Sequence, residues 1–103
     1  MTPVLSVGPG VIRETVRLAA LEVPGVLRVG RGGPRWRDVL GGSPVRVRIR
    51  EGRVDVTVRL VARPRQPLVT LTSQVREAVG AAVERLLGME LGAVTVLVDG
   101  VGG

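Results

Sequence analysis

The stretch Leu21-Glu22-Val23-Pro24-Gly25-Val26 separates a helical part of the chain from a strand-rich part. Pro24 cannot continue a helix, because it lacks a backbone N–H and its ring clashes with the preceding turn. It also drives Val23 toward extended geometry, and Gly25 can adopt the backbone angles of a reversal. The stretch therefore predicts the end of a helix, a turn, and a strand that starts at Val26 and runs to Val29.

The residues before this stretch have the period of an amphipathic helix. Gly8-Pro9 suits a helix start, since proline is accepted at the first helical position. Apolar residues then recur at steps of three and four, at Ile12, Val16, Ala19, Ala20 and Val23. We expect a helix that ends at Pro24. The short β-prone segment 4–7 before it is a candidate extra edge strand.

Residues 45–60 alternate between apolar and polar side chains on both sides of Glu51-Gly52. Two alternating runs joined by a two-residue turn that contains glycine predict a β-hairpin. Its valines occupy one face and its arginines the other, and a slip of one residue would bury arginines, so the register is firm. In this register Arg50 faces Arg53, Arg48 faces Asp55, and Arg46 faces Thr57, and we expect Asp55 to pair with Arg48.

A second helix and a last strand follow the hairpin. Pro67 can open the helix, whose expected buried stripe is Leu68, Leu71, Val75, Ala78, Val79, Ala82 and Leu86. Gly80 in mid-helix is typical of close packing against another element, and Gly88 is a candidate C-cap. The last strand is expected at 93–98, ended by Asp99-Gly100.

The resulting order, helix, strand, strand, strand, helix, strand, predicts an α+β two-layer sandwich. Two amphipathic helices cover one face of a small mixed sheet. We expect a single domain over residues 1–103, with a loop at 30–44 that holds a helical turn near 37–40, and a glycine-rich end at 99–103.

Composition narrows the function. The chain has no cysteine and no histidine, so disulfides, thiolate metal sites and histidine catalysis are excluded. No acidic pair suggests a metal or acid–base site, and we expect no enzyme and no cofactor. No apolar run is long enough to span a bilayer, and no signal peptide is recognised. These features favour a cytoplasmic protein whose membrane contact is peripheral or through a partner.

The charge of +6 comes with 15 basic residues, all of them arginine. Such a surface attracts anions, although arginine in place of lysine also follows from a GC-rich genome. The candidate partner-binding surface is the polar face of the hairpin together with one loop residue: Arg46, Arg48, Arg50, Arg53, Arg59 and Trp36. Its arginines either are a solvated face or dock an acidic partner or anionic lipid headgroups. Trp36 either anchors the 30–44 loop on the sheet or is an exposed docking residue.

Several segments together carry a family resemblance. They are the first helix from Val11-Ile12 to Ala19-Ala20, Glu22-Val23-Pro24-Gly25-Val26, the strand 54–58, the helical segment 75–79 and the ending 88–101. In this order the chain resembles the alkaline shock protein family of bacterial envelope stress response proteins. The resemblance implies a non-enzymatic scaffold or adaptor, with protein partners that include a membrane anchor protein, and self-association in some members.

Two functions remain open at this stage. The first is the adaptor, acting by protein–protein contacts. The alternative is a basic nucleic-acid-binding module that uses the arginine face of the hairpin. Single-strand binders interleave aromatic platforms with their charge, and no aromatic residue lies on any expected strand, so we consider nucleic acid an unlikely partner. Open first and last strands also invite pairing with another copy as a homo-oligomer.

Overall fold

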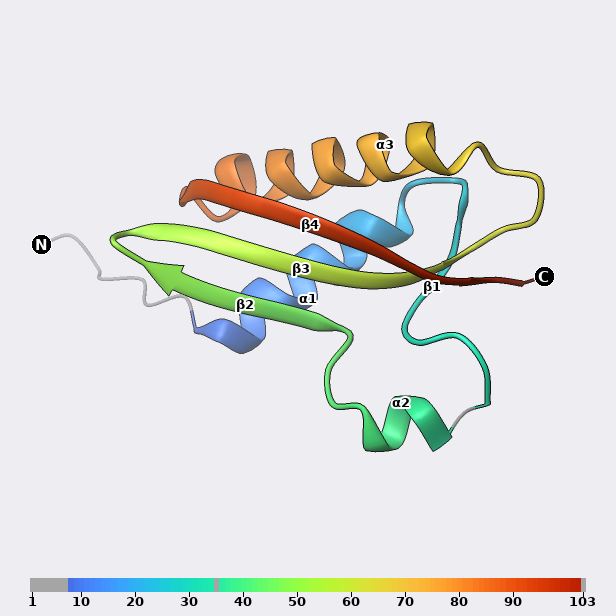
Figure 1. Ribbon diagram of the computed structural model, residues 1–103. Helices are drawn as coiled ribbons and strands as arrows, with labels where there is room; N and C mark the ends of the chain where they lie inside the picture. The colour runs from blue at the N-terminus through green and yellow to red at the C-terminus, as the bar shows by residue number, and fades with distance from the viewer. Residues whose placement is uncertain (1–7, 35, 103) are drawn as a thin grey trace, which may run out of the picture.

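A computed structural model describes residues 8–34 and 36–102, and Figure 1 shows their arrangement. The candidate edge strand at 4–7 lies outside the described residues. The elements in chain order are α1 (Pro9–Leu21), β1 (Val26–Val29), α2 (Trp36–Leu40), β2 (Val45–Arg50), β3 (Arg53–Ala62), α3 (Leu68–Ala81), a π-helical turn η1 (Ala82–Leu86) and β4 (Glu90–Val101). This order confirms the predicted α+β class, and α2 corresponds to the predicted helical turn.

Strand β3 is the centre of a mixed sheet. β4 runs parallel to β3 along its whole length. β2 and β1 are both antiparallel to β3, β2 beside residues 53–58 and β1 beside residues 60–62. Because β4 occupies one side of β3 throughout, β2 and β1 must share the other side, one after the other. The sheet is therefore three strands wide, and the 30–44 segment leaves its edge between β1 and β2.

The hairpin has the predicted register. Arg50 lies opposite Arg53, Arg48 opposite Asp55, and Arg46 opposite Thr57. Glu51 and Gly52 have φ values of 52° and 77°. Positive φ at both central residues defines the type I′ turn, whose twist matches that of the flanking strands. The alternating pattern and the turn thus agree on one pairing.

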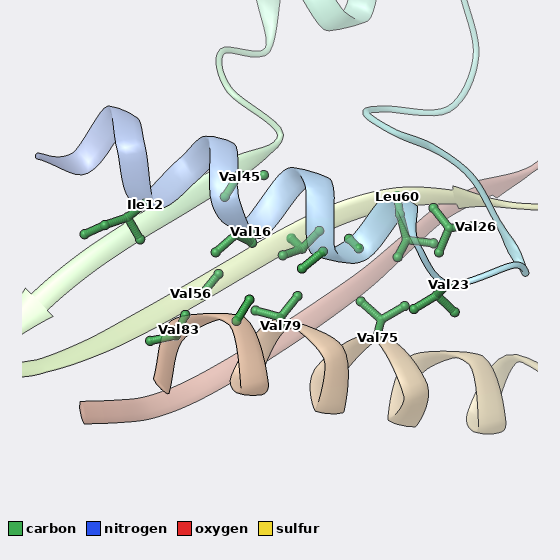
Figure 2. Close-up of a cluster of buried hydrophobic side chains, with 14 of the residues drawn as sticks. Ile12, Val16, Val23, Val26, Val45, Val56, Leu60, Val75, Val79 and Val83 are labelled. Atoms are coloured by element: carbon green, nitrogen blue, oxygen red, sulfur yellow. The ribbon is translucent and has the colours of Figure 1, made fainter. Parts of the chain in front are cut away.

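The core lies between the sheet and the two long helices, which cover the same sheet face (Figure 2). Ile12 and Val16 of α1 and Val75 and Val79 of α3 are fully buried. They pack with the inward side chains of β3, which are Val54, Val56, Val58 and Leu60. Burial of an aliphatic side chain of this size stabilises the fold by roughly 1.5–3 kcal/mol. Aliphatic residues alone supply this layer.

The joint at Pro24 forms as predicted, but its glycine serves a different purpose. α1 ends at Leu21, and Val23 and Val26 on either side of the proline are buried. The φ of Gly25 is not positive, so no special backbone angle is needed. A β-carbon at Gly25 would lie 2.7 Å from both Gln66 Oε1 and Leu71 Cδ1. A larger residue would force the buried Leu71 side chain to shift, so glycine allows the joint to pack closely against the start of α3.

The predicted buried stripe of the second helix is wrong at both of its ends. Leu68 is 42% exposed and Leu86 is 76% exposed, whereas Val83 is fully buried. The cause at the C-terminal end is the π-helical turn, in which the Leu87 N–H donates to the Ala82 carbonyl oxygen, five residues back. This wider turn changes the phase of the helix after Ala82 and rotates Leu86 out of the core. Val83 lies four residues after Val79 and belongs to the same buried stripe, from which the prediction omits it.

Two glycines of the α3 region confirm their predicted roles. A β-carbon at Gly80 would lie 3.0 Å from Leu91 Cδ2, so α3 packs closely on β4 at this point. Gly88 has a φ of 63° and ends the helical segment. Both positions determine how the chain passes from α3 into β4.

Strand β4 is longer than the predicted 93–98. Its pairing with β3 continues through two irregularities, one opposite Asp55 and one between Leu60 and Val61. Gly92 lies at the first and Asp99 at the second. Glycine and aspartate usually indicate strand ends, but a β-bulge can hold such residues while the pairing continues beyond it.

Candidate partner-binding surface

The sheet face opposite the helices carries the five predicted arginines, and we call it the arginine face. Arg46, Arg48 and Arg50 project from β2, and Arg53 and Arg59 from β3. The first four are exposed, and the Arg59 side chain is 33% exposed. Because the buried valines alternate with them on the same strands, all five lie on one face.

Three of these arginines have acidic partners within the protein. Arg53 Nε lies 3.2 Å from Glu90 Oε1, Arg50 Nε lies 3.7 Å from Asp55 Oδ2, and Arg59 Nη1 lies 3.5 Å from Asp99 Oδ1. The Arg53–Glu90 pair is exposed on both sides, and a pair of this kind contributes about 0–1 kcal/mol. All three pairs reduce the net charge of the face at its two ends.

The predicted pair between Asp55 and Arg48 is wrong. Asp55 pairs diagonally with Arg50, and its other oxygen accepts a hydrogen bond of 2.8 Å from the Ala93 N–H of the β4 bulge. The bulge presents this N–H to the carboxylate and so fixes its orientation. Among the described residues, Arg46 and Arg48 consequently have no acidic partner.

A shallow depression lies beside these two arginines. Its volume is about 480 Å³, and its polar lining comes from all three strands of this part of the sheet: Arg46 and Arg48, Asp55 and Thr57, and Thr95. The two guanidinium groups and two hydroxyls are hydrogen-bond donors. Arg50 and the Ala93 N–H already hold the Asp55 carboxylate of this lining. Arg46 and Arg48 can therefore bind a further group that bears negative charge.

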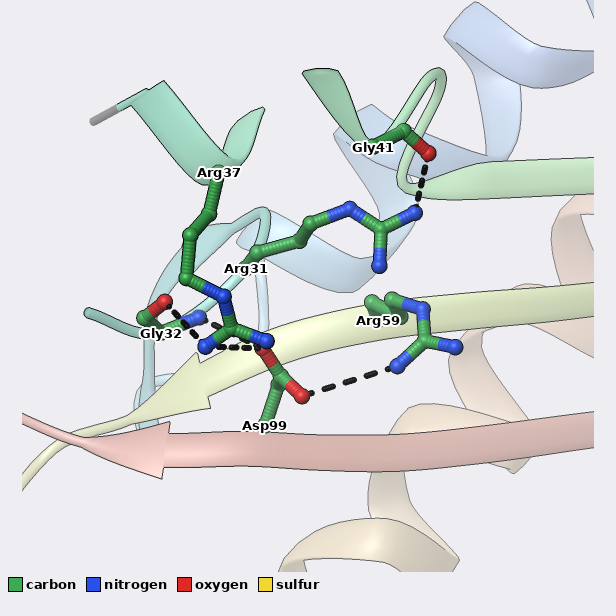
Figure 3. A network of polar contacts seen from close by, with 6 residues as sticks. All are labelled: Arg31, Gly32, Arg37, Gly41, Arg59 and Asp99. Carbon is green, nitrogen blue, oxygen red and sulfur yellow. Dashed lines mark hydrogen bonds and ion pairs between the residues drawn. The ribbon is translucent and has the colours of Figure 1, made fainter. Parts of the chain in front are cut away.

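At the other end of the face, Asp99 organises a polar network that the sequence did not reveal (Figure 3). One carboxylate oxygen accepts a hydrogen bond of 2.7 Å from the Gly32 N–H. Arg37 donates to the Gly32 carbonyl oxygen at 2.8 Å and lies 3.8 Å from the same carboxylate. Asp99 thus connects β4, the central strand through Arg59, and the segment between β1 and β2.

The same contacts lower the pKa of Asp99 below its usual value. The hydrogen bond from the Gly32 N–H is the largest cause, and the positive charges of Arg37, Arg59 and Arg31 add to it. Partial desolvation opposes the shift. The register between β3 and β4 could have suggested the contact between Asp99 and Arg59. Arg59 lies opposite Leu97, and Asp99 comes two residues after Leu97 on β4.

Trp36 does not anchor the loop on the sheet, because its side chain is 61% exposed. It opens α2, which stands away from the sheet beyond the β1–β2 edge (Figure 1). Asp99, Gly32 and Arg37 perform the anchoring instead. The structure therefore brings the five arginines together on one face but leaves Trp36 apart from them.

The family model that matches residues 4–102 is that of the alkaline shock protein 23 family, with a cell envelope-related function. This chain belongs to the alkaline shock protein family. The match covers nearly the whole chain and confirms the resemblance, which rested on the order of the segments. No curated protein matches the chain in sequence. In the described residues, no helix is long and apolar enough to cross a membrane.

Similar solved structures include several forms of MamM CTD. One variant has a TM-score of 0.57 at 19% identity, covering 88% of this chain and 94% of its own. The copper form has a TM-score of 0.56 at 19% identity, with coverage of 88% and 84%. A nickel form of another variant has 0.57 at 19%, with 88% and 96%. At this identity the likeness shows the shared α+β fold alone.

Proposed function

We propose that this protein is a non-enzymatic adaptor that binds an acidic segment of a partner protein on its arginine face. The observation that carries the proposal is the position of Arg46 and Arg48, which are exposed beside a depression. Neither has an acidic partner among the described residues. Arginines that only keep a surface soluble need not lie beside a recess. These two line one together with the hydroxyl groups of Thr57 and Thr95.

The geometry of β2 indicates what kind of segment fits. Side chains two residues apart on a strand point to the same face and are about 6.6–6.8 Å apart. An extended partner segment has the same spacing between alternate side chains. Acidic residues at alternate positions would thus meet Arg46 and Arg48 one to one, and a guanidinium group binds a carboxylate through two parallel hydrogen bonds.

Family membership favours a partner at the cell envelope. We infer that this partner is a membrane-anchored protein with an acidic segment on the cytoplasmic side. The adaptor would then reach the inner face of the membrane indirectly. Such a role needs no reacting group, and the chain contains neither histidine nor cysteine.

The test compares two double variants with equal charge. Arg46→Glu with Arg48→Glu reverses the two unpaired arginines, and Arg63→Glu with Arg65→Glu reverses two exposed arginines between β3 and α3. The probe is a fluorescent peptide with glutamate at alternate positions. We expect the first variant to lose about tenfold or more in affinity, as for charge-assisted hydrogen bonds. The second should stay within about threefold of the unmodified protein.

Equal losses in both variants would show that only net charge matters and would contradict the proposal. Two further probes define the competing partners: vesicles of phosphatidylglycerol and a single-stranded RNA. If either probe bound more tightly than the peptide, lipid headgroups or nucleic acid would replace the acidic segment as the proposed partner. The strands carry no aromatic side chain, so base stacking, which stabilises single-strand complexes by about 1–3 kcal/mol per base, is not available on the sheet.

Trp36 is proposed as a second contact for a longer partner. It is the only tryptophan, so its fluorescence reports its own surroundings. The free protein should emit as a water-exposed indole. A partner segment that spans the arginine face and reaches α2 should shift this emission to shorter wavelength. An unchanged spectrum at saturation would remove Trp36 from the binding surface.

A further inference from the structure

Strand β4 has an open backbone edge that the docking role does not use. β4 pairs with β3, and among residues 8–34 and 36–102 nothing pairs with its other side. This leaves the outward N–H and C=O groups of a 12-residue strand available to another chain. We propose that β4 pairs with β4 of a second copy, antiparallel, so that the two sheets become one.

The incomplete burial of the β4 valines favours an additional strand beside β4. Val54, Val56 and Val58 on β3 are at most 1% exposed. Their neighbours on β4, which are Val94, Val96 and Val98, pack on the same core but remain only half-buried. The difference arises because β4 has a strand on one side only. A second β4 alongside would cover these valines and the adjacent Leu97, which is 37% exposed.

Charge indicates that the occupant is a second copy. β4 contains no basic residue, although the chain has 15 arginines. Its two acidic residues, Glu90 and Asp99, already face Arg53 and Arg59. An acidic segment would be repelled by these carboxylates at either end, and the middle of β4 offers no charge to attract any partner. The neutral middle of another β4 meets no like charge.

The register of β4 makes this pairing self-complementary. Pairing with β3 is regular from Val94 to Val98, between the two irregularities. A two-fold axis at Val96 therefore places Val94 opposite Val98 of the second copy, and Thr95 opposite its Leu97. The valine pairs lie on the helix side and the Thr95–Leu97 pairs on the arginine face. Cross-strand pairs between β-branched and aliphatic residues stabilise a sheet.

Such an axis is perpendicular to the sheet, so both arginine faces point the same way. The dimer would present two docking surfaces side by side to partner proteins that lie on the same side of the sheet. An interface formed by so short an edge is in the small class, below about 1,200 Å², so we expect a micromolar dissociation constant. The dimer does not depend on the docking function, because it uses the outer edge of β4 whereas docking depends on Arg46 and Arg48 of β2; Thr95, which also lines the depression, is the residue that the two surfaces share.

The experiment measures association by sedimentation equilibrium from micromolar to millimolar concentration. Thr95→Lys with Leu97→Lys places lysine opposite lysine twice, which should raise the dimer dissociation constant about tenfold or more. Thr70→Lys with Gln74→Lys is the control, since both residues are exposed on α3 and add the same charge. The control should dimerise like the unmodified protein. Thermal unfolding confirms that each variant is folded.

A complementary variant tests the register itself. Thr95→Glu with Leu97→Glu should also be monomeric alone, and mixing it with the Thr95→Lys, Leu97→Lys protein should restore a mixed dimer. A monomeric unmodified protein at millimolar concentration, an undisturbed lysine variant, or a mixture that stays monomeric would each overturn the proposal. Arg46→Glu with Arg48→Glu should dimerise normally and lose the acidic peptide, so failure of docking and failure of dimerisation are distinguishable.

Discussion

The strands on the two sides of β3 obey the same alternation but differ in charge. β2 has three arginines in six residues, and β4 has none in 12. Both place aliphatic side chains toward the helices and leave the other side chains on the arginine face. The alternation lets both strands pack on the same core, so it does not distinguish one side of β3 from the other. The position of the arginines decides which side repels another copy and attracts an acidic partner.

Natural sheets often protect an outer strand with charge. On β2 the arginines supply this protection, since two such strands placed together would oppose like charges. β4 lacks it, and its regular middle between two irregularities remains open to pairing, while its own place in the fold depends on close packing at those irregularities. The two strands should therefore respond differently to mutation: β4 to changes in volume and β2 to changes in charge.

The largest effect is expected from Gly92→Val on β4. A side chain there would meet the Asp55 carboxylate, and its β-carbon would lie 3.3 Å from the Val54 carbonyl oxygen. We expect a loss of about 3 kcal/mol in the free energy of unfolding, at the upper end for an overpacked site. Arg48→Thr on β2, measured in the same urea titrations, should stay within about 0.5 kcal/mol. Equal losses would contradict the distinction between shape and charge.

A second large effect is expected where α3 leads into β4. Val83→Ala removes buried methyl groups and should cost about 2 kcal/mol. Leu86→Ala, only three residues later, should cost less than about 0.5 kcal/mol because Leu86 is 76% exposed. Urea unfolding of the two variants decides between the π-helical turn and a regular helix. A regular helix would make Leu86→Ala the more damaging change.

Sequence reasoning succeeded where one pattern had one solution. In the hairpin, period-two alternation and a two-residue turn allowed a single register, so all five arginines were placed correctly. In α1, a regular 3.6-residue period gave the buried residues Ile12, Val16, Ala19 and Ala20, and also Val23 just after the helix. Both patterns are local, and the residues that form them are close in sequence.

The errors arose where distant segments decide the local structure. The exposure of Leu86 depends on a π-helical turn, which the sequence does not indicate because Leu86 fits the stripe of a regular helix. Asp99 resembled a strand end because its partners, Gly32 and Arg37 of α2, lie more than 60 residues earlier in the chain, where local sequence gives no sign of them. Asp55 took Arg50 rather than Arg48 because the β4 bulge turned its carboxylate. Such contacts become visible only when the strands are assembled.

A smaller effect concerns the acid response of the β4 end. The folded pKa of Asp99 is lowered, so its carboxylate stabilises the fold above its unfolded pKa of about 3.9. This contribution is lost as the pH falls through the folded pKa. Asp99→Asn should lower the melting temperature at pH 7 and reduce its further decline below about pH 4. Thermal melts of both proteins between neutral and acidic pH measure this.

Glu14→Gln provides the control, because the pKa of Glu14 is also lowered, by its hydrogen bond to Arg17 on α1. That pair is exposed on a helix, so we expect Glu14→Gln to change the melting temperature at pH 7 less than Asp99→Asn does. If Glu14→Gln instead had the larger effect, the network around Asp99 would not hold the segment between β1 and β2 in place.

The smallest expected effect is also the one that compares the two strands most directly. Raising the salt from about 0.15 M to about 1 M shortens the screening length from about 8 Å to about 3 Å. Binding of the acidic peptide at Arg46 and Arg48 should weaken severalfold, because it depends on attraction between opposite charges. Pairing of β4 should strengthen slightly, because screening reduces the repulsion between two copies of charge +6. Anisotropy titrations and sedimentation equilibrium at both salt concentrations measure the two responses. If both interactions weaken with salt, β4 pairing is not the neutral contact inferred from its sequence, and the two sides of β3 differ less than their arginines indicate.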